Sequence, residues 1–212
     1  MFINFKGAKT YINTGGKNID VDKTTLCFIH GSGQNHLSFV QQSRYFANKE
    51  YSVIVPDLPG HGFSEGVPCV SIKENAEWIS DLVKELNLNN IVYLGHSQGC
   101  LTGLELNKNH PKLLKGIIFI AGSNIIPVNQ FLIDLASNDF QKAYKMMVTW
   151  GHSKDGAMFT GNMPGHSHFG EGFNIMNMNN EKTLKIDLEA CNKYDGGTDA
   201  AQKIKIPTLA VL

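Results

Sequence analysis

The stretch NNIVYLGHSQGC, residues 89–100, is the most informative part of this chain for its fold. It begins as a short apolar run of β-prone residues and ends in the pentapeptide Gly-x-Ser-x-Gly, with Ser97 at its centre. A helical pattern follows at once. Strand, serine and helix in this order predict a sharp turn that lifts the hydroxyl of Ser97 clear of a sheet. Gly95 and Gly99 are then required, because strand and helix pass too closely for a β-carbon. A glycine-rich loop after a buried strand is the alternative interpretation.

Around this turn, strands alternate with helices. Residues 2–5 and 8–13 alternate in polarity around Lys6-Gly7 and predict an antiparallel hairpin. Continuous apolar runs at 25–29, 51–55 and 116–121 predict strands buried on both faces of a parallel sheet. Helices are predicted at 38–48, with Phe39, Tyr45 and Phe46 available to the core, at 72–86 behind a Ser71–Glu74 capping box, and at 98–109. The alternation predicts an α/β fold with a mostly parallel, doubly wound sheet.

The pattern changes after residue 122. Short helices are predicted at 129–136 and 140–148, then a loop rich in Gly, Met, Asn and His over 150–180, and then a helix at 181–193 with Leu184, Leu188 and Cys191 on one face. A short helix leads into the apolar run 206–212, which predicts one more core strand. We therefore divide the chain into a core at 1–122, an inserted helical lid at 123–203 and a return to a core strand at 204–212.

Composition argues against other classes of protein. The 212 residues suffice for one domain with a full core. The formal net charge is zero, which gives no reason to expect a nucleic acid or an anionic membrane as partner. The N-terminus lacks the pattern of a signal peptide, and no apolar run reaches the roughly 20 residues of a membrane span. The widely spaced cysteines favour reduced packing residues of a cytoplasmic protein over a disulfide or zinc framework: Cys27, Cys69, Cys100 and Cys191.

Three motifs occur in order, each at the end of a predicted strand. They are His-Gly-Ser-Gly at 30–33, Asp-Leu-Pro-Gly-His-Gly-Phe-Ser at 57–64 and Gly-His-Ser-Gln-Gly at 95–99. Together they resemble the α/β-hydrolase superfamily, in its branch of serine esterases, cofactor-free haloperoxidases and C–C bond hydrolases. The resemblance is dense over residues 25–122. The lid resembles family lids only in position and helical character and carries no substrate signature.

The resemblance implies the parts of an acyl-transfer site. Ser97 is the implied nucleophile. The backbone N–H groups of Gln98, at a helix start, and of Ser32, after His30-Gly31, are the implied donors of an oxyanion hole. A small-molecule substrate is expected, and no metal or organic cofactor is implied. The loops that support these groups contain His30, Gly31, Gly33, Gly95, His96 and Gly99. Under a non-catalytic interpretation, His-Gly-Ser-Gly is simply a tight turn before a helix.

Other polar residues have plainer interpretations. His96 adjoins Ser97 on a strand and is expected to point to the opposite face, which argues against a role as general base. Asp57 and His61 lie in a Gly/Pro-rich turn that they are expected to shape. A metal site built from the lid matches no zinc spacing, so a solvated loop is favoured for His152, Asp155, His166, His168 and Glu171.

The usual partners of the nucleophile have no recognisable place in these 212 residues. In the family, the acid usually follows the strand that residues 207–212 begin, and the histidine follows the next strand. Three explanations stay open. We favour an N-terminal fragment of a longer hydrolase, because the chain stops within an apolar strand. A pseudo-hydrolase that binds a small molecule is the second. In the third, a lid histidine such as His166 or His168 reaches Ser97. The acidic residues nearest the end of the chain are Asp195 and Asp199, and Asp195 is the candidate acid.

The predicted function is hydrolysis of a small carboxylic ester or a related acyl bond through a Ser97 acyl-enzyme. The alternative from another class is a catalytically inactive small-molecule-binding protein on the same scaffold. A C–C bond hydrolase or a cofactor-free haloperoxidase comes next, whereas dehalogenase or epoxide-hydrolase chemistry would use an aspartate nucleophile. Substrate identity and oligomeric state are not predicted, since specificity depends on the shapes of lid and pocket.

Overall fold

The centre of the protein is a twisted, mostly parallel sheet. The computed structural model describes residues 1–152 and 167–212. Its seven strands have the order β1-β2-β4-β3-β5-β6-β7. β1 (Phe2–Phe5) and β2 (Ala8–Asn13) form the predicted antiparallel hairpin, and β2 joins β4 (Ser52–Pro56) antiparallel. The remaining pairs are parallel. β4 pairs with β3 (Thr25–Ile29), β3 with β5 (Ile91–His96), β5 with β6 (Leu114–Ile120) and β6 with β7 (Thr208–Val211).

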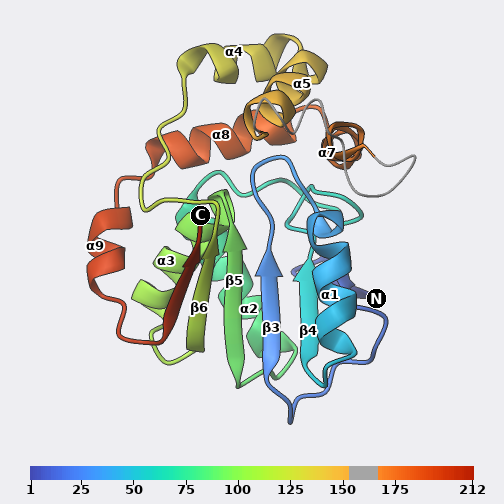
Figure 1. Cartoon of the computed structure of the whole chain (residues 1–212), viewed down its shortest axis with the longest axis vertical. Coiled ribbons are helices and arrows are strands. Elements are labelled where there is room, and N and C mark those ends of the chain that lie inside the picture. Colours follow the sequence, from blue (N-terminus) through green and yellow to red (C-terminus); the bar gives the residue numbers. More distant parts are fainter. Residues whose placement is uncertain (153–166) are drawn as a thin grey trace.

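Helices lie on both faces of this sheet (Figure 1). α1 (Val40–Ala47) lies on one face, whereas α2 (Ile72–Glu85) and α3 (Gln98–Asn109) lie side by side on the other. The predicted α/β fold with a doubly wound sheet is therefore confirmed. The carboxyl ends of the parallel strands meet along one edge, which is where open α/β sheets place their ligands.

The start of α2 follows from the predicted capping box. The hydroxyl of Ser71 accepts a hydrogen bond from the N–H of Glu74 at 3.2 Å, and the Glu74 carboxylate accepts one from the N–H of Val70 at 2.9 Å. One apolar face follows the helical period, and Ile72, Ala76 and Ile79 are fully buried. Each large aliphatic side chain buried in this way contributes roughly 1.5–3 kcal/mol.

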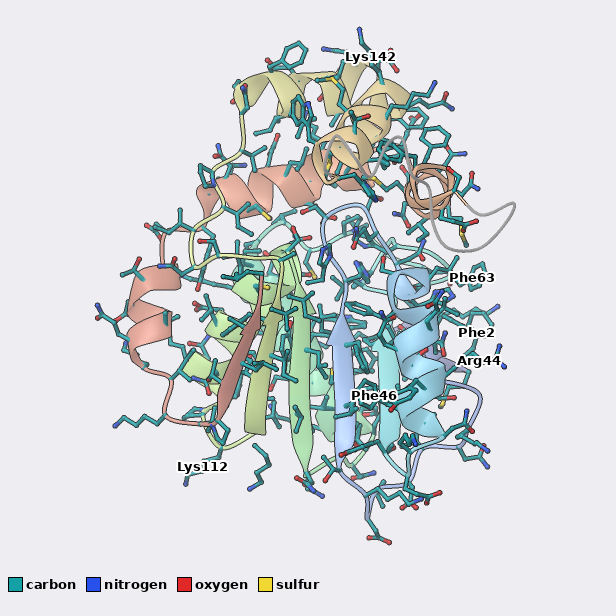
Figure 2. All side chains as sticks on the ribbon, viewed as in Figure 1. Phe2, Arg44, Phe46, Phe63, Lys112 and Lys142 are labelled. Atoms are coloured by element: carbon teal, nitrogen blue, oxygen red, sulfur yellow. The ribbon has the colours of Figure 1, made fainter. Side chains whose placement is uncertain are left out.

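The helix predicted at 38–48 is shorter and is preceded by a 3-10 turn at His36–Phe39. Phe39 and Phe46 face the core, and Figure 2 shows Phe46 on the sheet side of α1, with its ring 6.3 Å from that of Phe28. The prediction for Tyr45 is wrong, because 58% of its surface is exposed. Adjacent helical residues point about 100° apart, so Tyr45 and Phe46 do not share a face.

The chain leaves the sheet after β6 and forms a helical insertion, residues 123–203, before it returns as β7. α4 (Gln130–Asn138), α5 (Phe140–Trp150), α7 (His168–Asn177) and α8 (Thr183–Lys193) lie beyond the carboxyl ends of the strands (Figure 1). They share their own apolar core, which includes Leu132, Ile133, Tyr144, Val148, Met176, Leu184 and Leu188.

One prediction for the insertion needs correction. The loop predicted over 150–180 contains α7, whose Phe169 and Phe173 pack into the insertion core and whose first turn is capped by the Ser167 hydroxyl. Gly170 and Gly172 lower helix propensity there, so local sequence underestimates a helix that tertiary packing stabilises. α9 (Gly197–Gln202) packs against α3, and its Ala200 belongs to an apolar cluster that includes Leu104 of α3 and Ala190 and Cys191 of α8.

β7 forms one edge of the sheet, and its Leu209 and Val211 side chains are about half exposed. The four cysteines are free thiols, three of them buried. Within the described ranges, every helix is too short or too polar to cross a membrane.

Candidate acyl-transfer site

Ser97 lies at the junction of β5 and α3 with φ 51° and ψ −115°. This positive φ places a non-glycine residue in a sparsely populated region, at a cost of about 1–3 kcal/mol. Hydrogen bonds hold the strained turn from both sides. The N–H of Ser97 donates to the carbonyl of Ile120 at 3.1 Å, and its own carbonyl accepts from the N–H of Cys100 at 2.8 Å. The strand–serine–helix turn predicted from residues 89–100 is therefore present.

The two glycines of the pentapeptide are sterically required. A β-carbon on Gly95 would overlap the carbonyl oxygen of Gly99, and one on Gly99 would overlap the carbonyl oxygen of Ile29. The loop after β3 also passes against the turn, because a β-carbon on Gly31 would come within 3.0 Å of the Ser97 β-carbon. These contacts bring the end of β3, the end of β5 and the start of α3 together at one point.

Ser97 and Ser32 line a cavity of about 390 Å³ between the strand ends and the helical insertion. The walls come mainly from the segment before α4, from α5 and from α8, and none of these lining residues is an acid, a histidine or a basic residue. They are Ile126, Pro127, Val128, Asn129, Leu132, Met147, Trp150, Gly151, Leu188 and Cys191. A larger cavity of about 590 Å³ lies between the end of α4 and α8. It is lined by charged surface residues of both signs, and neither Ser32 nor Ser97 is among its lining residues.

Two backbone N–H groups of buried residues next to Ser97 have no hydrogen-bond acceptor in the described part of the chain. Ser32 is 5% exposed and Gln98 is fully buried, yet among the described residues neither N–H has a hydrogen-bond acceptor. Gln98 is the first residue of α3, where intrahelical acceptors are lacking. Buried N–H groups are nearly always paired. Two exceptions at the residues predicted as oxyanion donors make this the most informative polar feature of the site.

His30 is buried as a neutral imidazole. Its Nδ1 donates to the carbonyl of Gly31 at 3.0 Å, and its Nε2 accepts from the N–H of Leu58 at 3.2 Å. A second proton on Nε2 would face that N–H. Burial, reinforced by the positive charge of nearby His61, lowers the pKa of His30 to about 4. The residue therefore joins the loops after β3 and β4 as an uncharged linker.

This buried imidazole predicts acid destabilisation. Below pH 6.5, the ordinary pKa of histidine, the unfolded chain takes up a proton on His30, whereas the folded protein does so only near pH 4. The free energy of unfolding is therefore highest above pH 6.5 with respect to this residue and falls as the pH drops toward about 4. At about 1.4 kcal/mol per pKa unit, the loss amounts to about 3 kcal/mol. Urea unfolding at pH 7.0 and 4.5 should show a fall in unfolding free energy that is about 2 kcal/mol smaller in His30→Gln than in the wild type. Equal falls in the two proteins would contradict the prediction.

Asp57 shapes the loop after β4, as predicted. Its buried carboxylate accepts hydrogen bonds from the N–H groups of His36 at 2.7 Å and Phe63 at 2.8 Å. His96 Nδ1 donates to the side-chain oxygen of Gln34 at 3.0 Å, and the same oxygen accepts from the N–H of Gly31 at 3.1 Å. Sequence reasoning missed Gln34, and its position in a polar loop offers no signal that would reveal this role.

Of the candidate substitutes for the base and acid, only Asp195 has a described side chain. His166 lies outside the described residues, and His168 is the first residue of α7. Asp195 is exposed and lines a different cavity of about 170 Å³ with Ser71 and Tyr194. Within the described part of the chain, no side chain forms a hydrogen bond with the Ser97 hydroxyl. The site thus combines a strained serine with unpaired N–H groups, and no described residue is assigned as its base.

Comparison with known proteins agrees with the geometry of this site. A family model described as alpha/beta hydrolase fold matches residues 24–196. The chain belongs to this family. A hydrolase from Pseudomonas aeruginosa PA01 has the same fold, with a TM-score of 0.83 and 16% sequence identity over 99% of this chain and 78% of that one. The resemblance read from the three motifs is thereby confirmed.

Relatives by sequence include hydrolases with different names. A putative esterase/lipase 2 of Mycoplasma genitalium is 30% identical over 104 residues, covering 48% of this chain and 39% of that protein. The (E)-2-((N-methylformamido)methylene)succinate hydrolase of Acinetobacter baylyi is 32% identical over 98 residues, covering 46% of this chain and 37% of that protein. The alignments thus span about two-fifths of the length of these curated relatives.

Proposed function

We propose that this alpha/beta hydrolase cleaves a small carboxylic ester or a related acyl bond through an acyl-enzyme on Ser97. The proposal is supported above all by the N–H groups of Ser32 and Gln98, which have no hydrogen-bond acceptor among the described residues and adjoin a serine in a strained turn. Such donors act on the negative charge that develops on a carbonyl oxygen, and each contributes about 3 kcal/mol to transition-state stabilisation.

The reaction follows from these positions. The Ser97 oxygen forms a bond to the substrate carbonyl carbon, whose electron pair moves onto the oxygen facing the two N–H groups. When that pair returns, the bond to the alcohol breaks, the alcohol leaves with the proton that a general base has taken from Ser97, and an acyl-serine ester remains. Water then attacks the same carbon and gives a proton to the base, and the acid is released as that proton returns to the Ser97 oxygen. No described residue is assigned as this base.

The walls of the 390 Å³ cavity indicate an uncharged acyl group. Aliphatic, methionine and tryptophan side chains predominate, and burial raises the pKa of the one thiol, Cys191, to about 12, so that it is neutral. Transfer of a carboxylate into such surroundings without a partner costs several kcal/mol. Hence the acyl part is proposed to be small and neutral.

A substrate panel tests this proposal. Purified chain is assayed with p-nitrophenyl acetate, butyrate and hemisuccinate, and release of p-nitrophenol is followed against a Ser97→Ala blank. We expect kcat/KM for the butyrate to exceed that for the anionic hemisuccinate by at least about a hundredfold, equivalent to about 3 kcal/mol. Equal rates for the two esters would contradict the neutral acyl group.

A second candidate is a catalytically inactive protein that binds a small molecule in this cavity. It is favoured by one observation, the lack of a described hydrogen-bond partner for the Ser97 hydroxyl. Saturable binding of an ester without release of p-nitrophenol above the Ser97→Ala blank would support it.

A further inference from the structure

Asp187 in α8 has a buried carboxylate, and this group has no role in the acyl-transfer reaction described above. It is 1% exposed and lies on the apolar face of the helix, together with Leu184, Leu188 and Cys191. A buried carboxylate is strongly unfavourable unless it is paired and hydrogen-bonded. The hydrogen-bond partners of Asp187 therefore indicate its structural role.

Three donors from the core surround this carboxylate. Oδ2 accepts from the N–H of Gly33 at 2.7 Å and from Nε2 of His61 at 2.9 Å, whereas Oδ1 accepts from Nε2 of Gln98 at 3.4 Å. Gly33 follows Ser32, and Gln98 follows Ser97. One carboxylate from the insertion thus contacts the residue after Ser32 and the residue after Ser97. We call Asp187, Gly33, His61 and Gln98 the Asp187 clamp.

His61 supplies the charge that balances the carboxylate. Its Nδ1 lies 2.9 Å from the carbonyl oxygen of Pro59, and its Nε2 faces Asp187, so both ring nitrogens face acceptors. Only the imidazolium donates at both positions. Burial lowers the pKa of His61, but the charge and hydrogen bond of Asp187 outweigh burial and raise this pKa above its ordinary value. The clamp is therefore a buried ion pair between the insertion and the loop after β4.

Neighbouring contacts fix the clamp in place. The Asn179 amide donates to the carbonyl of Gly33 at 2.6 Å and accepts from the N–H of Gly62 at 2.7 Å. Both backbone groups of Gly33 are therefore bonded to the insertion. Gly33 has φ +65°, and a β-carbon there would come within 2.9 Å of Met176 and 3.0 Å of Leu184. One turn along α8, Cys191 Sγ lies 3.6 Å from the Ser32 hydroxyl.

We propose that Asp187 is a positioning residue, whose carboxylate holds the Ser32–Gly33 loop and Gln98 in the geometry of an oxyanion hole. The expected effect on catalysis rests on the proposed function. The expected effect on the Ser32–Gly33 loop rests only on the contacts described above. The insertion then acts as more than a cover for the cavity. It completes the donor geometry, and small displacements of such donors cost large factors in rate.

The test compares Asp187→Asn with Glu189→Gln, a matched loss of one carboxylate at the surface of the same helix. Asparagine keeps the shape but removes the negative charge that balances His61 and one of the two acceptor oxygens. Hydrogen exchange, followed by mass spectrometry of a peptide covering residues 30–36, should become at least about tenfold faster in Asp187→Asn and stay unchanged in Glu189→Gln. For p-nitrophenyl butyrate, kcat should fall at least about tenfold with KM within about threefold.

The outcomes separate this inference from the proposed function. Unchanged exchange over 30–36 in folded Asp187→Asn overturns the clamp, and unchanged kcat overturns its catalytic role while the esterase proposal stands. If the wild type hydrolyses no ester, the proposed function fails, and the exchange data still decide the clamp. If Asp187→Asn does not fold, Gln98→Met decides instead, since it removes only one side-chain donor and keeps the backbone N–H. In that variant we expect faster exchange at residues 30–36 and a kcat at least about threefold lower, and wild-type values for both would overturn the inference.

Discussion

Replacement of Ser97 by alanine is expected to lower kcat/KM for p-nitrophenyl butyrate by at least about a thousandfold, because no acyl-enzyme can form. The alanine β-carbon occupies the same strained backbone at φ 51°, so the fold and the two unpaired N–H groups are retained. Steady-state kinetics of the purified variant provide the measurement. Ser137→Ala, at an exposed serine of α4, is the matched control and should retain wild-type kinetics. Activity in Ser97→Ala within tenfold of the wild type would contradict a serine nucleophile.

The same residue separates catalysis from stability. Ser97→Gly should also be inactive, but glycine adopts φ 51° without penalty, so relief of strain should raise the free energy of unfolding by about 1 kcal/mol relative to Ser97→Ala. Urea unfolding of the two variants gives this difference. A higher stability for the alanine variant would show that the turn is not strained as described.

Gly95→Ala should be among the most destabilising single substitutions in the core. Its β-carbon would meet backbone atoms, the carbonyl of Gly99 and the N–H nitrogen of Cys100, which cannot rotate away as a side chain can. Relief requires β5 and α3 to move apart at the centre of the sheet. We expect a loss of at least about 3 kcal/mol in the free energy of unfolding, or failure to accumulate as soluble protein.

Gly116→Ala provides the control for that experiment. Gly116 is also buried in the parallel sheet, on β6, but its surroundings leave room for a methyl group: the closest atom to a β-carbon there is the carbonyl oxygen of Pro207 at 3.4 Å. The free energy of unfolding should therefore change by less than about 1 kcal/mol. Similar losses in the two variants would mean that close approach of β5 and α3 does not explain Gly95.

Local sequence rules account for most of the core. β1, β2, β3 and α3 have the predicted bounds, because hairpin alternation, buried apolar runs and helical periodicity are properties of neighbouring residues. The pentapeptide predicts its own turn because steric demands at Gly95 and Gly99 arise within a few residues. By contrast, α7 depends on Phe169 and Phe173 reaching the insertion core, which offsets the cost of its glycines.

The contacts of the Asp187 clamp could not be predicted from neighbouring residues. Gly33 and Asp187 are 154 positions apart, and their contact exists only once the insertion has folded over the strand ends. One local signal was present, since Asp187 interrupts the apolar face defined by Leu184, Leu188 and Cys191. A charged residue at such a position predicts burial with a partner, but it does not reveal which loops supply the donors.

Covalent labelling provides the sharpest test of Ser97 as an activated nucleophile. The chain is incubated with a fluorophosphonate, its intact mass is measured, and the modified peptide is sequenced by tandem mass spectrometry, with Ser97→Ala as the control. We expect one adduct, located on Ser97 and absent from the variant, because only a serine held at an oxyanion site reacts at a useful rate. Folded protein that acquires no adduct, or an adduct that persists in Ser97→Ala, would contradict a nucleophilic role for this serine.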